Sequence, residues 1–551
     1  MNKISILPTP VHLEVLSDRK VLTSKITRTQ NLDGVLKAAE QARFRKDFAL
    51  EQFRKEGYAL RTTQDGINIY AESDAGFYYA KNILPKLKSV PEGRLQEVLI
   101  VDYPAFPIRG VIEGFYGMPW TWQERTDVIE AASQVGFNAF IFAPPDINRK
   151  VNWREPLPYS YKEKLEELIK NAHRHHVKFV YEVLPIGIDL ASKQDYKKLL
   201  ERCKEVITLG ADAIMVAFDD TNDYEGQRVK KEKAALGQAR LANNLLQQLG
   251  SDDVLLAFVP VEYHGTKVTP YLVTIGKELD PEVYIGWSGP KIRSASITKE
   301  DAERYAEIVR RKPFLGHNFP VVDEMRKKRR LTIGPLMGLD SRLADAVSGI
   351  SFNCMEVPYA SLVSLFTAGD FAWNPNWYIP RRSIINSARV HGTNLMKLVE
   401  LNPESYANPS GVPDIARALR HHRLKDLHSD TVSKLRRIFN TMVSLDDLMS
   451  EGIDSRIYHE IRPWLVQGNI VGALGNLILD GKGSTISWKT KGYVASKMIT
   501  GPRLGGTVFE DWILREMGFP ANLFYYVPGS WAISYFLETM NRKRHQRQRS
   551  I

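Results

Sequence analysis

The sequence predicts a (β/α)8 barrel that follows a small α+β domain and precedes a mainly helical C-terminal region. Two observations predict the barrel: eight short apolar runs recur between residues 108 and 353, and helical stretches separate most of them. Buried strands that alternate with helices indicate a parallel sheet, and eight repeats indicate that the sheet closes on itself. A doubly wound open sheet is the main alternative, but no G-x-G-x-x-G turn follows any of these runs.

Residues 1–107 form the predicted α+β domain. The stretch YALRTTQDGINIYAES (58–73) predicts a hairpin that turns at Asp65-Gly66. The stretch AGFYYAKNILPKL that follows predicts one amphipathic helix that ends at Pro85. Two prolines in DYPAFPIRG then indicate a domain boundary near 103–109.

The barrel is predicted over residues 108–372. Between its strands lie helical stretches such as WQERTDVIEAASQVG and YKEKLEELIKNAHRHH. The eight predicted strands are 108–113, 139–144, 178–184, 213–218, 254–260, 283–287, 313–318 and 349–353.

Residues 373–551 are mainly helical by periodicity and end in a basic tail. SKLRRIFNTMVSLDDLM and IRPWLVQGNIVGALGNLI show the helical period most clearly. The glycines of the second stretch have neither the P-loop lysine nor the strand context that phosphate binding needs, so we assign them no ligand.

Composition excludes several classes of protein. The formal charge of +11 is concentrated locally, as in NRKRHQRQRSI, and no zinc finger or RNA-recognition signature occurs, so a nucleic-acid partner is not favoured. The two cysteines, Cys203 and Cys354, exclude a disulfide framework and a Cys-rich metal site. The start of the chain lacks the apolar core of a signal peptide, and no run approaches the roughly 18 apolar residues of a membrane span. We therefore expect a cytoplasmic protein without a membrane partner.

Candidate site residues lie where the predicted strands end, because functional groups of such barrels gather at the C-terminal ends of the strands. They comprise carboxylates, amides and aromatic rings, the set that binds the hydroxyls and apolar faces of sugars. We expect no metal or cofactor, and read the histidines of NAHRHH as exposed residues at a helix end. The candidates are Gly114, Asp219, Asp220, Tyr263, Trp287, Asn318, Asp323 and Asn353.

The adjacent carboxylates Asp219 and Asp220 are the most specific of these candidates. They follow AIMVAF, where the strand gives way to a loop and two consecutive side chains can reach one cavity. Two close carboxylates cannot both ionise easily, so the pKa of one rises and the other falls. Taken alone, an Asp-Asp after a strand is more often a cap or a turn.

A set of motifs distinguishes these interpretations. RGVIEGFYGMPWTWQER, NWREP, FDDT, VEYHGT, WSGP, HNFPVVD and FNCMEVP occur in the order and spacing of glycoside hydrolase family 84. This family comprises bacterial and animal β-N-acetylglucosaminidases, O-GlcNAcases included, and the resemblance covers residues from about 100 to 372. It implies a (β/α)8 barrel and a retaining, substrate-assisted hydrolysis of N-acetylglucosamine glycosides, in which the sugar's acetamide oxygen attacks the anomeric carbon and forms an oxazoline.

The resemblance also implies roles for the residues around the acetamide group. Asp219 resembles the carboxylate that binds the acetamide N–H and offsets the charge of the oxazolinium ion. Asp220 resembles the general acid that protonates the leaving oxygen and then activates water. Tyr263 is similar to the family's tyrosine beside the acetamide, Asn318 to its amide contact, and Trp287 to a wall of the pocket.

Three further residues resemble contacts to the sugar ring. Asp323 is similar to the carboxylate that anchors the 4- and 6-hydroxyls. Asn353 and the backbone of Gly114 match contacts to ring hydroxyls. Each has a structural alternative, since a strand-end Asn is often a turn residue and an aromatic ring is often part of the core.

The sequence departs from the family pattern at two places. Pro145 stands where the family has a sugar-binding lysine, so either Arg149 or Lys150 replaces that contact or it is lost. Gly316 and His317 stand where an aromatic residue often precedes the family's Asn. These departures leave open a second hypothesis, a non-catalytic or altered-specificity sugar-binding protein on the same barrel.

Overall fold

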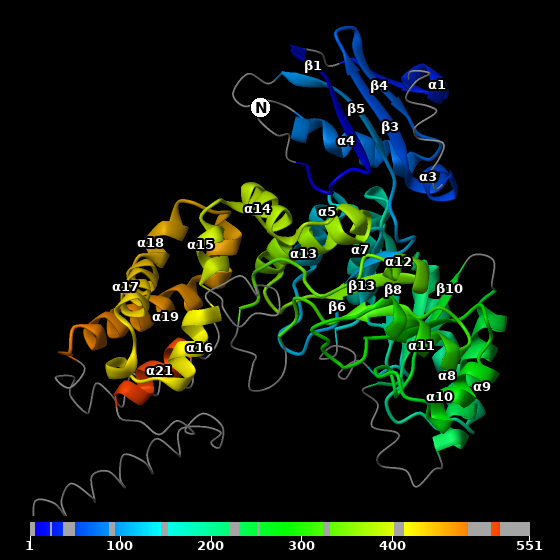
Figure 1. Cartoon of the computed structure of the whole chain (residues 1–551). Helices are drawn as coiled ribbons and strands as arrows, with labels where there is room; N and C mark the ends of the chain where they lie inside the picture. The colour runs from blue at the N-terminus through cyan, green and yellow to red at the C-terminus, as the bar shows by residue number, and fades with distance from the viewer. Residues whose placement is uncertain are drawn as a thin grey trace, which may run out of the picture. The chain divides into compact units, whose positions relative to one another are not determined.

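The computed structural model describes residues 6–21, 25–36, 50–87, 94–144, 152–219, 231–250, 254–322, 331–401, 413–482 and 508–517. They belong to two compact units, Met1–Val321 with Pro335–Ser387 and Val322–Gly334 with Ala388–Ile551. The first unit contains an N-terminal sheet and a closed barrel (Figure 1). The domain boundaries predicted at residues 107 and 372 stay predictions.

The N-terminal sheet has five strands in the order β1-β5-β3-β4-β2. Helix α4 covers one face, where Leu60 and Ile100 meet Ile83, and α1 and α3 cover the other through Val35 and Phe53 (Figure 1). Both faces are thus buried, as a small α+β domain requires. The elements are β1 (His12–Val21), β2 (Ile26–Thr29), α1 (Leu32–Val35), α3 (Leu50–Glu56), β3 (Tyr58–Thr63), β4 (Gly66–Tyr70), α4 (Asp74–Leu87) and β5 (Leu95–Asp102).

The predicted hairpin is confirmed, and the predicted end of the helix after it is wrong. Strands β3 and β4 pair antiparallel with Thr63 opposite Gly66, so the turn lies one residue earlier than predicted. Helix α4 continues through Pro85 to Leu87. Pro85 lies in the last turn, where its missing N–H costs one hydrogen bond, and burial of Leu87 offsets that loss.

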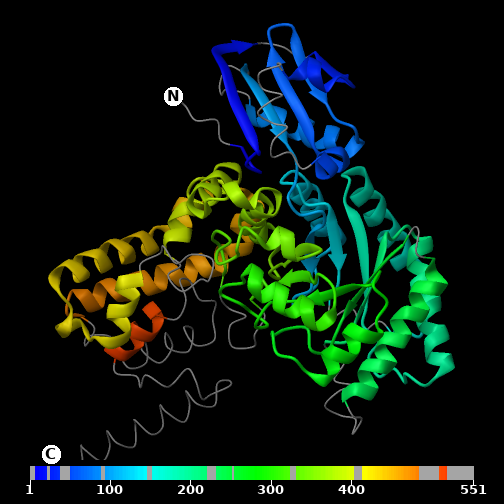
Figure 2. The ribbon, with the colours of Figure 1, turned by 45° about the vertical axis from the view of Figure 1, so that its right-hand side comes forward.

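The barrel consists of eight parallel strands, each within two residues of its predicted bounds. They pair in chain order from β6 to β13 and close between β13 and β6, with helices on the outside (Figures 1 and 2). This confirms the predicted (β/α)8 barrel. The strands are β6 (Arg109–Glu113), β7 (Ala139–Phe142), β8 (Lys178–Val183), β9 (Ala213–Ala217), β10 (Leu255–Val259), β11 (Tyr284–Trp287), β12 (Phe314–His317) and β13 (Gly349–Asn353).

The outer helices present apolar side chains to the strands. Helix α5 begins with a capping box between Thr121 and Glu124, and α13 is buried along its whole length. The helices are α5 (Trp122–Ser133), α7 (Tyr159–Arg174), α8 (Lys193–Thr208), α9 (Lys231–Leu249), α10 (Pro270–Glu278), α11 (Lys299–Val309), α12 (Leu343–Ala346) and α13 (Pro358–Trp373). Helix α14 (Pro380–His391) follows, and its Ser387 hydroxyl donates to the Val363 carbonyl of α13 at 2.7 Å.

The described part of the second unit is helical, as predicted for the C-terminal region. Its two longest helices, α17 and α19, pack closely because α19 presents glycines: a Cβ on Gly472 would lie 2.5 Å from the carbonyl oxygen of Phe439, and one on Gly475 would lie 2.5 Å from its ring. The glycines of this stretch therefore have a packing role. The helices are α15 (Leu395–Glu400), α16 (Pro413–His421), α17 (Ser429–Val443), α18 (Leu445–Ser450), α19 (Ser455–Leu479) and α21 (Val508–Glu516). Within the described ranges, no helix is long and apolar enough to cross a membrane.

Two carboxyl groups, one partly and one fully buried, join the N-terminal domain to the barrel. The Glu56 carboxylate accepts hydrogen bonds from both terminal nitrogens of Arg109, at 2.9 and 3.0 Å. Asp102, which is fully buried, accepts the Trp373 ring N–H at 2.9 Å and the Val11 N–H at 3.0 Å, and its other oxygen lies 3.0 Å from the Tyr58 hydroxyl. The first barrel strand is therefore bonded to α3, and helix α13 is bonded to strand β5 of the sheet.

Asp102→Asn tests this junction through the pH dependence of stability. Burial raises the pKa of Asp102 to about 7, so the folded protein holds a proton that the unfolded chain releases near its ordinary pKa of about 4. The stability contributed by this proton is complete below pH 4 and is lost as pH rises to 7. We expect the free energy of unfolding of wild type to fall relative to the variant between pH 5 and 8, by on the order of 1–3 kcal/mol. A pH-independent difference in urea denaturation would contradict this.

Candidate active site

Alternation of side chains along the strands decides which residues face the barrel interior. Ile112, Val180, Met215 and Phe314 belong to one cluster inside the barrel. Asp219 continues the inward series of β9, four residues beyond Met215, and lies partly buried in the turn after the strand.

The same alternation places three other predicted residues at this end of the barrel. Gly114 follows Ile112 by two residues, Asn353 pairs with Ile112 in the ladder, and Asn318 follows Phe314 by four. Asp219, Gly114, Asn318 and Asn353 thus share the mouth formed by the C-terminal ends of the strands. Asp220 and Asp323 lie outside the described residues.

Asn353 connects two of these residues directly. Its side-chain oxygen accepts the Gly114 N–H at 3.1 Å. Its amide nitrogen donates to the Gly114 carbonyl at 3.3 Å and to the Asn318 side-chain oxygen at 3.1 Å. Both N–H groups are therefore used within the protein, which makes Asn353 a positioning residue for its neighbours.

Asn318 extends this network to the loop after β11. Its amide nitrogen donates to the Ile292 carbonyl at 2.7 Å. One N–H and one oxygen lone pair remain after this bond and the bond from Asn353. Asn318 can therefore bind a ligand while it is held in place from both sides.

Trp287 does not face the mouth. Gly286 pairs with the inward residue Phe314, so Trp287, the next residue, points outward toward α11. Its ring is 1% exposed, is stacked on Tyr305 with centroids 5.3 Å apart, and donates to the Gly265 carbonyl at 2.9 Å. In this structure the ring has no exposed face for a sugar, because the alternation of the strand places it beneath a helix.

Tyr263 lies in the loop after β10 and is partly exposed. Its carbonyl accepts the Ser288 N–H at 2.8 Å, and its ring centroid lies 5.3 Å from that of His264. The loops after β10 and β11 are therefore bonded to each other at this residue.

A buried ion pair holds the loop that carries Gly114. Glu113 binds Arg125 through two bonds of 2.7 and 2.9 Å, and it accepts the Trp120 N–H at 3.1 Å. Both side chains of the pair are almost fully buried. Burial raises the pKa of Glu113, and the guanidinium of Arg125 opposes that rise. Glu113 thus faces α5, and its role is to fix the loop.

Glu356 is a second anchor of this loop that sequence reasoning did not identify. Its carboxylate accepts the Met118 N–H at 2.8 Å. The carbonyl of the preceding residue, Met355, accepts the Trp120 ring N–H at 3.3 Å. The only sequence signal is that both residues lie within FNCMEVP, a motif that pattern reasoning reads as a strand end.

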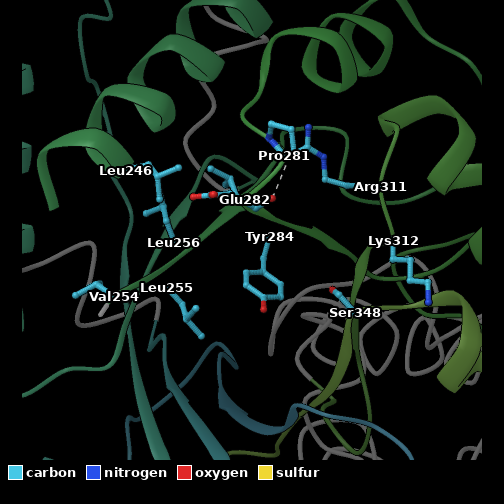
Figure 3. A pocket seen from close by; sticks show the side chains of 11 residues that line it. Leu246, Val254, Leu255, Leu256, Pro281, Glu282, Tyr284, Arg311, Lys312 and Ser348 are labelled. Atoms are coloured by element: carbon cyan, nitrogen blue, oxygen red, sulfur yellow. Dashed lines mark hydrogen bonds between the residues drawn. The ribbon is translucent and has the colours of Figure 1, made fainter. Parts of the chain in front are cut away.

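The pocket in Figure 3 does not belong to this mouth. Among the described residues, no group of three His, Cys, Asp or Glu side chains is placed to hold a metal ion. A pocket of about 480 Å³ lies at the opposite end of the barrel, around Tyr284 and Ser348 (Figure 3). There the guanidinium of Arg311 donates to the carbonyls of Leu279 at 2.6 Å and Val283 at 3.2 Å, which marks it as a structural clamp.

Arg125→Met tests the ion pair. The variant leaves the Glu113 carboxylate buried without its cation, so we expect the free energy of unfolding to fall by about 3–5 kcal/mol. The double variant with Glu113→Gln removes the unpaired charge and should recover part of that loss. Urea denaturation of both single variants and the double variant measures the coupling, and strictly additive losses would rule out a direct pair.

Comparisons with known proteins agree with the motifs. A family profile described as β-N-acetylglucosaminidase matches residues 109–400, more than half of the 551-residue chain. The Protein O-GlcNAcases of Rattus norvegicus and Mus musculus are each 30% identical to it over 272 residues, which is 47% of this chain and 29% of theirs. The match thus spans less than a third of the length of these curated relatives.

Solved structures extend the likeness to the fold. CpGH84B superposes with a TM-score of 0.77 at 23% identity, over 93% of this chain and 100% of that one. A mutant of the Thermobaculum terrenum O-GlcNAc hydrolase gives a TM-score of 0.65 at 23% identity, over 75% of this chain and 94% of that one. The resemblance seen in the motifs is confirmed by the family match: this chain belongs to the β-N-acetylglucosaminidase family of glycoside hydrolases, glycoside hydrolase family 84.

Proposed function

We propose that this chain is a retaining β-N-acetylglucosaminidase that hydrolyses terminal N-acetylglucosamine glycosides by substrate-assisted catalysis. The observation that carries the proposal is the place of Asp219, at the mouth of the barrel two residues after the end of β9, with Asp220 next in the chain. The bonded set of Gly114, Asn318 and Asn353 at the same mouth supports it.

In the proposed reaction the acetamide oxygen of the sugar attacks the anomeric carbon while the bond to the leaving oxygen breaks. Asp219 accepts the acetamide N–H and offsets the positive charge that develops on the oxazolinium ring. Asp220 donates a proton to the leaving oxygen, so the aglycone leaves as an alcohol. Asp220 then takes a proton from water, which opens the oxazoline and restores the acetamide with retention at the anomeric carbon.

The environment of Asp219 suits this role. Phe218 is buried, and its N–H donates to the Val259 carbonyl at 2.9 Å, so the strand is fixed up to the residue before Asp219. A fixed carboxylate stabilises developing charge better than a mobile one, since no reorganisation is needed during the reaction. Tyr263, on the neighbouring loop, is proposed to line the acetamide side of the pocket.

A non-catalytic sugar-binding protein is the second candidate function. The absence of the family's lysine at Pro145, which lies outside the described residues, favours it. A product-resolved assay on a panel of N-acetylhexosaminides separates the two: binding without any turnover at high protein concentration supports the second candidate.

Asp220→Asn removes the proposed acid. We expect kcat/KM to fall by about 100-fold or more on aryl N-acetylglucosaminides with poor leaving groups, and much less on those with good ones. A plot of log kcat/KM against leaving-group pKa should therefore be steeper for the variant. Equal losses across the series would show that Asp220 does not act as the acid.

Asp219→Asn removes the negative charge opposite the oxazolinium ion. We expect kcat to fall by about 10²–10³-fold whatever the leaving group, and a thiazoline that mimics the oxazoline to bind more weakly. Asp430→Asn, which changes an exposed carboxylate on α17, is the matched control. Unchanged thiazoline affinity in the Asp219 variant would refute its assigned contact.

A further inference from the structure

Two loops on one side of the mouth are joined into a single wall. We call residues 260–269, after β10, and 288–298, after β11, the β10–β11 wall. The Gly265 N–H donates to the Gly289 carbonyl at 2.9 Å, and the buried ring of Trp287 donates to the Gly265 carbonyl at 2.9 Å. The two loops are thus bonded to each other and to the core beneath them.

The second loop of the wall is also fixed internally and tied to the sugar site. The Lys291 N–H donates to the Ser294 hydroxyl at 3.0 Å, and the Ser288 hydroxyl lies 3.4 Å from the Lys291 carbonyl. The next carbonyl along the chain, that of Ile292, accepts the bond of 2.7 Å from Asn318. The backbone around Lys291 is therefore held at a set distance from a proposed contact of the sugar.

The wall carries a surplus of positive charge. Its cationic residues are Lys267, Lys291 and Arg293. Its one carboxylate is that of Glu262, which accepts a hydrogen bond from the Thr269 hydroxyl. Lys267 and Lys291 are exposed, and each lies two residues from the bond between Gly265 and Gly289. That bond joins the two stretches of backbone that carry these lysines.

Arg293 lies on the side of the wall that faces β12. It contributes, after burial, to lowering the pKa of His317 to about 4, so its guanidinium is close to the end of that strand. His317 immediately precedes Asn318. Positive charge therefore extends from the exposed lysines toward the sugar site, and a neutral His317 adds none at pH 7.

We propose that the β10–β11 wall binds an anionic group on the aglycone, the part of the substrate beyond the cleaved bond. The inference rests on the proposed function and narrows its substrate class to N-acetylglucosamine glycosides with a carboxylate, sulfate or phosphate near that bond. A solitary exposed lysine contributes little because water screens it. Two lysines carried by bonded loops can instead act together on one anion.

Matched substrates test the charge of the aglycone. One pair is a serine-linked N-acetylglucosamine peptide flanked by Glu or by Gln. The other is a disaccharide of N-acetylglucosamine linked to glucuronic acid or to glucose. We expect kcat/KM at low salt to favour the anionic member of at least one pair by about two- to tenfold, and 0.5 M NaCl to abolish the preference. The pair that responds identifies the source of the anion, a peptide or a glycan.

The double variant Lys267→Gln with Lys291→Gln assigns the effect to the wall. It should lose the preference while its kcat/KM on the neutral members stays within twofold of wild type. Lys277→Gln, an exposed lysine on the last turn of α10, is the matched control and should keep the preference. Both variants change exposed side chains, and circular dichroism confirms their folding.

The outcomes distinguish failure of the proposed anion site from failure of the proposed hydrolase function. Hydrolysis of neutral and anionic members at equal rates, or a preference that survives in the double variant, overturns the wall as an anion site and leaves the hydrolase proposal standing. No hydrolysis of any N-acetylglucosaminide overturns the proposed function itself.

Discussion

The structure depends on one constraint, the alternation of side chains along eight parallel strands that close on themselves. Closure leaves each strand with one face toward the barrel interior and one toward the helices, so the position of a residue in its strand decides whether it can take part in the site. Asp219, Asn318 and Asn353 fall on the inward series. Trp287 falls on the outward series and becomes part of the core.

The loops at the mouth are positioned by buried polar groups that are bonded within the protein. The ion pair of Glu113 and Arg125 fixes the loop after β6 through the Trp120 N–H, and Asn353 fixes it through the Gly114 N–H. Such groups are costly to bury unless every partner is satisfied, so they specify one loop geometry. A site on loops needs this support, because a rigid scaffold must place flexible segments within a fraction of an ångström.

The mouth divides into two regions with different chemistry. One contains amide groups bonded to each other at 3.1 Å and a carboxylate at a strand end, a set suited to hydroxyl and acetamide groups. The other is the β10–β11 wall, whose charges lie on a fixed backbone and suit a charged neighbour of the sugar. The bond from Asn318 to Ile292 connects the two regions.

The sequence by itself determined the barrel, its strands, the identity of the family and the place of Asp219, because the order of strands and helices and the motifs at strand ends are properties of neighbouring residues. Only the tertiary structure decided that Trp287 is buried. The same holds for the hydrogen bonds that the Asn353 amide donates to Gly114 and Asn318, and for the bond from the Met118 N–H to Glu356. Their partners lie far away in the chain, Gly114 and Asn353 being 239 residues apart. No local pattern encodes such a contact, since it arises only when closure of the barrel brings its first and last strands together.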